Sequence, residues 1–223
     1  MLSATSIRLG GLVALASAVV VIIADLLRLI VLHAVFQRLG SDPSALVFII
    51  VETPATSETA TTGLYAFDMA LYLLAGLLLL FGLIGLYAGQ AEETGVLGLV
   101  GFVVAFSGTA LVVGSSWTNL FAVPSVAMGA PELLDAEQAA GPVTLGYILS
   151  GGLFTVGLLV FGVSTFRARV YPRVASITLI IGALFLLPPV PLNNLPSAVG
   201  VAWMGFILFT GRNTSVEQPS RVR

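Results

Sequence analysis

Two charged residues, Asp25 and Arg28, interrupt an apolar run that extends from Leu9 to about Leu32. As a helix, this run is about 36 Å long at 1.5 Å per residue, which is enough to cross a bilayer. An Asp or Arg near the middle of a membrane helix costs about 2.5–3.5 kcal/mol on insertion scales. The rest of the chain must therefore fold so that these two side chains face protein, water or an opposite charge rather than lipid.

The composition places the whole chain, and not only this segment, in a membrane. Hydrophobic residues make up 57% of the sequence and charged residues 9%, with a mean hydropathy of +1.06. Soluble domains carry about a quarter charged residues. Because a spanning helix takes about 20 residues, six crossings with short loops use almost all of the chain. We expect an all-α, polytopic transmembrane bundle that forms a single transmembrane domain.

The apolar and polar stretches alternate in a way that sets the expected spans and loops. Residues 33–62 are polar and hold a short apolar insert, 44–51, which suits an interfacial or re-entrant helix. Residues 118–142 form an acidic loop, and prolines make 188–196 a tight hairpin in which Asn193 and Asn194 form turn hydrogen bonds. The spans are expected at about 9–32, 64–88, 95–117, 143–166, 174–190 and 196–211, followed by a polar cytoplasmic tail at 212–223.

The distribution of arginine predicts the orientation. With six spans and both termini in the cytoplasm, seven arginines and three glutamates give the inner side a charge of +4, whereas the outer loops carry −5. This follows the positive-inside rule, and an odd number of spans breaks it. All nine basic residues are arginine, which favours a bacterial genome and hence a bacterial plasma membrane. The inner arginines are Arg8, Arg167, Arg169, Arg173, Arg212, Arg221 and Arg223.

Small residues recur at helical spacing along two of the expected spans. Such stripes let helices approach closely, so they face either the rest of the bundle or a partner. We therefore expect a homo-oligomer or a membrane complex, besides the lipid bilayer, as the protein's partners. The stripes are Gly11, Ala14, Ala18, Val21, Asp25 and Arg28 in the first span and Gly98, Gly101, Ala105 and Gly108 in the third.

One polar cluster is expected inside the membrane. Asp68 lies near the outer end of the second span, at nearly the depth of Arg28, and Tyr72 follows one turn further in on the same face. Asp25, Arg28 and Asp68 either form a structural ion-pair clasp or line an outward-facing polar site. In the second case Asp25, as the excess charge, binds a cation or relays a proton.

Few other residues suggest chemistry. A serine hydrolase requires Ser115 or Ser116 with His33 and Asp25, and no Gly-x-Ser-x-Gly elbow supports it. His33 is the only histidine and there is no cysteine, so no metal site and no cofactor is expected. Trp203, in the middle of the last span, either packs in the bundle or lines a pocket.

These observations favour a protein that is not an enzyme. The main hypothesis is a membrane packing or accessory subunit, because small-residue faces are prominent and no catalytic set is present. The alternative is a small-solute or ion-coupled transporter with its site at Asp25, Arg28 and Asp68. The basic residues mark topology, and no nucleic-acid partner is expected.

Overall fold

The computed structural model describes residues 3–39, 57–135, 141–187 and 192–211, and within them every regular element is a helix. The expected insert at 44–51 and the tail at 212–223 lie outside the described residues. The elements are α1 (Ala4–Leu39), α3 (Ser57–Ala60), α4 (Gly63–Ala88), α5 (Ala91–Trp117), the π-helix η1 (Thr118–Ala122), α6 (Val123–Gly129), α7 (Glu132–Asp135), α8 (Pro142–Ala168), α9 (Arg173–Phe185) and α10 (Leu195–Thr210).

Four helical segments in the described part of the chain are long and apolar enough to cross a membrane, as expected of a membrane protein. They are Ala4–Leu29, Gly63–Ala88, Ala91–Gly129 and Thr144–Ala168. The last two expected spans correspond to the shorter apolar helices α9 and α10. With 13 and 16 residues, these helices are about 20 Å and 24 Å long, so length alone does not mark them as spans.

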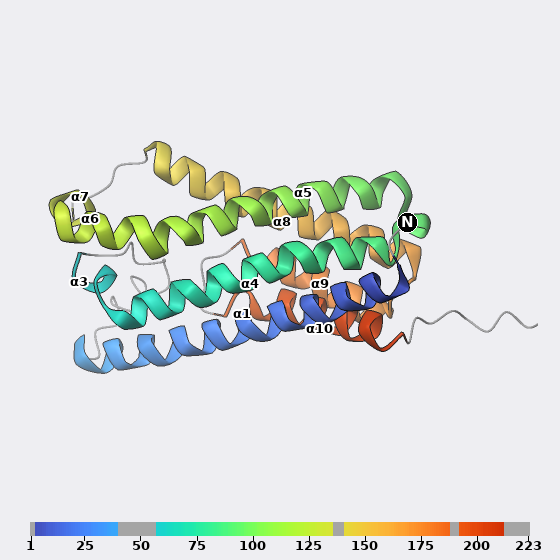
Figure 1. Cartoon of the computed structure of the whole chain (residues 1–223), viewed down its shortest axis with the longest axis horizontal. Helices are drawn as coiled ribbons and strands as arrows, with labels where there is room; N and C mark the ends of the chain where they lie inside the picture. Colours follow the sequence, from blue (N-terminus) through green and yellow to red (C-terminus); the bar gives the residue numbers. More distant parts are fainter. Residues whose placement is uncertain (1–2, 40–56, 136–140, 188–191, 212–223) are drawn as a thin grey trace, which may run out of the picture.

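The six apolar helices run side by side, each antiparallel to the one before it (Figure 1). The start of α1 and the end of α10 lie at one end of the bundle, where the Arg8 side chain is next to Gly211. We call this the proximal end, and the end that carries α3, α6 and α7 the distal end. Helix α1 packs against α4 and α10, and α5 packs against α8.

Small residues allow these close contacts between helices. A Cβ atom added to Gly10 would lie 2.5 Å from Gly85 Cα, and one added to Gly11 would lie 2.7 Å from the Gly205 carbonyl oxygen. The expected small-residue face of α5 is also buried. Large apolar side chains instead project outward, as Val19 and Ile23 do, which suits a surface in contact with lipid. The small-residue faces are thus used largely inside the bundle.

The structure corrects several expected boundaries. Helix α1 continues seven residues beyond 32, to Leu39, and α9 ends at Phe185 rather than 190, with 188–191 outside the described residues. The expected loop at 118–142 begins as a helix, because α5 continues through η1 and α6 to Gly129. This stretch is largely apolar, and Pro124, which has no N–H, lies just after the π-helix η1, an irregularity of the kind that occurs with proline inside a continuous helix.

Candidate functional site

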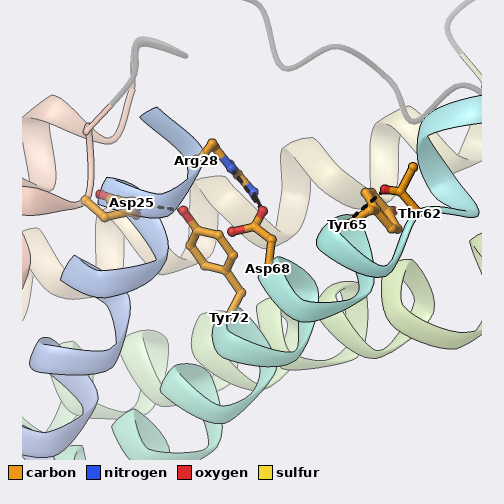
Figure 2. A network of polar contacts seen from close by, with 7 residues as sticks. Asp25, Arg28, Thr62, Tyr65, Asp68 and Tyr72 are labelled. Carbon is orange, nitrogen blue, oxygen red and sulfur yellow. Dashed lines mark hydrogen bonds and ion pairs between the residues drawn. The ribbon is translucent and has the colours of Figure 1, made fainter. Parts of the chain in front are cut away.

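Helices α1 and α4 bring the predicted polar residues together near the distal end. Asp25 and Arg28 are one turn apart on α1, and Asp68 and Tyr72 are one turn apart on the antiparallel α4 (Figure 2). Arg28 donates hydrogen bonds to Asp68 Oδ2 from Nε at 3.3 Å and from Nη2 at 3.1 Å. The expected Arg28–Asp68 pair is therefore present.

This ion pair lies at the edge of the bundle. The side chain of Arg28 is 39% exposed and that of Asp68 is 13% exposed. The Arg28 guanidinium also lies over the Tyr72 ring, with 4.5 Å between Cζ and the ring centroid, a cation–π contact that helps to orient both side chains. Because Arg28 and Asp68 carry opposite charges, the pair contributes no net charge to the cluster.

Asp25 is held in a different way from Asp68. It is only 4% exposed, and its Oδ1 accepts hydrogen bonds from the Tyr72 hydroxyl at 2.5 Å and from Asn194 Nδ2 at 3.0 Å. Its Oδ2 is buried and has no hydrogen-bond partner among the residues that the structure describes. Within the part of the chain that the structure describes, Asp25 forms no ion pair. The expected clasp of three charged residues is thus a clasp of two, and Asp25 is bonded only by neutral donors.

Asn194 is a member of the site that the sequence did not indicate. The sequence suggested that its amide forms turn hydrogen bonds, but the side chain reaches into the bundle and bonds Asp25. It is the N-cap residue of α10, and its side chain makes no capping bond. The only signal in the sequence was an amide residue close to prolines, at a depth in the membrane similar to that of Asp25. The sequence does not show which turn packs against α1.

A cavity of about 80 Å³ adjoins the cluster. Its wall comes from α1, α4, α5, α8 and α10 and is mainly apolar, and both residues that bond Asp25 belong to it. Trp203, proposed from the sequence as a pocket residue, is 42% exposed and is not in this wall. The polar residues of the wall are Ser17, Tyr72, Thr109, Asn194 and Ser197.

The cluster contains one carboxylate, Asp25, that is not paired with a positive charge in the described part of the chain. Among the residues described, no group of three or more His, Cys, Asp or Glu side chains is placed to hold a metal ion. The His33 side chain lies outside what the structure describes. What remains is a buried carboxylate with one unbonded oxygen, one hydrogen bond away from the wall of a cavity.

Comparisons with known proteins add no family to this description. No family model, no curated protein and no solved structure matches the chain. The function is therefore argued from the site itself.

Proposed function

We propose that this chain is a membrane carrier that binds a small solute in the cavity beside Asp25. One observation carries the proposal: among the described residues Asp25 forms no ion pair and its Oδ2 has no hydrogen-bond partner, although it is only 4% exposed, and both residues that bond its Oδ1 line a cavity. Ionisable groups within membranes are expensive, and they commonly mark pathways for ions, protons or substrates.

The charges of the cluster support this role for Asp25 in particular. Arg28 pairs with Asp68, so the three charged residues of the cluster sum to −1, and the excess charge belongs to Asp25. Tyr72 and Asn194 donate hydrogen bonds to Asp25 but bring no positive charge. A ligand that is cationic or donates a proton would supply the positive partner that Asp25 does not have in the described structure.

We also propose six spans with both termini in the cytoplasm of a bacterial cell. The short helix α10 begins at the level of Asp25, because Asn194, its N-cap residue, bonds Asp25. In the sequence, the apolar run of α1 continues seven residues past Asp25, to about Leu32, or about 10 Å of helix. Helix α10 thus extends from the proximal end past the middle of the apolar layer, and the arginine distribution supports the orientation.

A second candidate function is an accessory subunit that packs against a partner. Most small residues already serve contacts inside the bundle, but the distal half of α8 differs. Added Cβ atoms at Gly146, Gly151 and Gly152 would meet no atom of the described residues within 4 Å, and the neighbouring Leu145 and Ile148 are exposed. This segment is the place where a second copy or another membrane protein would pack.

The carrier proposal is tested by blocking the cavity. Ala198 lines it and is 4% exposed, so Ala198→Val and Ala198→Leu reduce its volume in two steps. Purified wild type is screened by thermal unfolding against small cations, anions and neutral solutes. We expect at least one class to raise the unfolding temperature of wild type and to lose this effect progressively in the two variants. If no solute stabilises wild type, and a monodisperse variant is simply more stable, the cavity is a packing void and the proposal fails.

A further inference from the structure

We infer that the ligand of this cavity is a small ammonium-type cation, such as ammonium or a short alkylammonium ion, recognised through its N–H groups. The inference rests on the proposed function, since it names the ligand class for the same site. It depends on three observations: which acceptors the hydroxyl groups of the cavity wall donate to, the charge of Asp25, and the volume of the cavity.

Three hydroxyl groups of the wall have already used their protons. Ser17 Oγ donates to the Ala75 carbonyl oxygen at 2.8 Å, and Thr109 Oγ1 donates to that of Ala105 at 2.7 Å. Ser197 Oγ donates to the carbonyl oxygen of Asn194 at 2.7 Å. A hydroxyl has one proton to donate and two lone pairs. These groups therefore present only acceptors to a ligand.

The distal part of the wall has the same character. The Tyr72 hydroxyl, the fourth in the wall, donates its proton to Asp25, and Asn194 uses one of its two N–H donors there. One amide N–H is the only side-chain donor of the described wall that is not already engaged. Asp25, to which both residues are bonded, is not itself in the wall, and its buried Oδ2 has no hydrogen-bond partner among the described residues. A site rich in acceptors and next to a negative charge favours a ligand that is positive and donates hydrogen bonds.

Size and apolarity narrow the ligand further. The cavity volume of about 80 Å³ leaves room for a small molecule. The wall contains more apolar residues than polar ones, among them Leu79, Phe154 and Val201. A metal ion without its water shell requires several oxygen ligands around one point, whereas an alkylammonium ion needs acceptors for its N–H groups and an apolar surface for its carbon atoms. This wall offers both of these contacts.

Calorimetric titration of the purified full-length protein in lipid nanodiscs tests the inference. The probes are methylammonium, tetramethylammonium and sodium as chlorides at equal ionic strength, and methanol as a neutral molecule of methylammonium's size. We expect methylammonium to bind and the other three to bind at least about tenfold more weakly, a ratio that corresponds to 1.4 kcal/mol. Asp25→Asn should lower the methylammonium affinity by a similar factor.

Two nearly isosteric variants test the acceptor argument directly. Thr109→Val removes an acceptor from the cavity wall. Thr178→Val is the control: the Thr178 hydroxyl is exposed and, like that of Thr109, donates a hydrogen bond to the carbonyl oxygen four residues earlier in its helix, that of Val174 at 2.9 Å. We expect a several-fold weaker methylammonium affinity for the first variant only. Equal losses in both variants would overturn the acceptor argument.

The probe set separates failure of this inference from failure of the proposed function. If methanol or tetramethylammonium binds as well as methylammonium and Ala198→Leu abolishes that binding, the cavity holds a solute but the ligand class is wrong. If sodium alone binds, the ammonium assignment is likewise wrong. If none of the probes binds and the wider solute screen also finds no ligand, both the inference and the proposed function fail.

Discussion

At the scale of single residues, the bundle treats its two membrane carboxylates differently. Asp68 receives two hydrogen bonds from the Arg28 guanidinium, whereas Asp25, although more deeply buried, receives only those of a phenol and an amide. Neutral donors stabilise a buried carboxylate less than an opposite charge does. Among the described residues, each carboxylate has one buried oxygen without a hydrogen-bond partner, Oδ1 of Asp68 and Oδ2 of Asp25. The two differ in that Asp68 has a paired cation and Asp25 has none, and for this reason the proposed function assigns binding to Asp25.

The Arg28–Asp68 pair should contribute measurably to stability. Its exposure lies between that of surface and fully buried pairs, so Asp68→Asn and Arg28→Gln should each lower the free energy of unfolding by about 1–2 kcal/mol. The double variant should lose less stability than the sum of the two single variants, because removing both charges leaves neither of them unpaired. Unfolding of all four proteins by denaturant in mixed micelles measures this coupling. Strict additivity would show that the two side chains do not interact in solution.

At the scale of helices, close crossings tie α1 to its neighbours. The Gly10–Gly85 contact has no room for a side chain, and association in lipid depends on such van der Waals contact. Gly10→Val should therefore push α1 from α4 and lower the free energy of unfolding by about 1–3 kcal/mol. The matched control is Gly146→Val, because an added Cβ there meets nothing within 4 Å. Equal losses at both positions would mean that the lower stability comes from the change in helix propensity and not from the close crossing of α1 and α4.

The connection between α8 and α9 contains a buried phenol that gives the fold a pH dependence. Tyr171 is 2% exposed and donates a hydrogen bond to the Leu86 carbonyl oxygen at 3.4 Å. Burial raises the pKa of Tyr171 above its ordinary value. The unfolded chain loses this proton near pH 10, before the folded protein does, so this contribution to stability is present below about pH 10 and is lost as the pH rises above it.

The test is a series of thermal unfolding curves between neutral and strongly alkaline pH. Above about pH 10, wild type should lose stability more steeply than Tyr171→Phe, which has no proton to release at this position. Parallel curves for the two proteins would assign the alkaline loss to other groups.

At the scale of the whole molecule, the sequence was informative about helices and faces but not about which surfaces meet. Apolar runs predicted the four long helices, and helical spacing placed Asp25 on the buried face of α1, with Arg28 at the edge of that face. The same reasoning was not applied to Trp203, which was considered as a pocket residue. The buried face of α10 follows Ala198, Val201 and Gly205, and Trp203 lies off this stripe, so attention to spacing would have placed it outside.

Other features were out of reach because they arise from packing between distant segments. The cavity needs side chains from five helices, and no local pattern specifies the volume that such a set leaves empty. The contact between Asn194 and Asp25 joins the last helix to the first. The helical extension through Gly129 was missed because the acidic residues Glu132, Asp135 and Glu137 led us to predict a loop over the whole of 118–142, although the first part of this stretch is largely apolar.

Cysteine scanning can establish the proposed topology, because the chain has no cysteine of its own. Single cysteines replace Ser3, Glu92 and Arg169 near the proximal end, and Thr61 and Asn193 near the distal side. In intact cells, a membrane-impermeant maleimide should label only the Thr61 and Asn193 positions. A cysteine at Asn193 that is not labelled, while the one at Thr61 is, would make α9 and α10 a re-entrant hairpin and reduce the spans to four.

The stability of Asp25→Asn, measured beside Asp68→Asn, tests the central claim most directly. Asparagine keeps an acceptor oxygen for Tyr72 and Asn194 and removes a buried charge that forms no ion pair in the described structure. Residues kept for binding often reduce stability. We therefore predict that Asp25→Asn unfolds at the same temperature as wild type or a higher one, whereas Asp68→Asn unfolds at a lower one. If Asp25→Asn loses as much stability as Asp68→Asn or more, Asp25 is a structural residue and the account of a binding site is wrong.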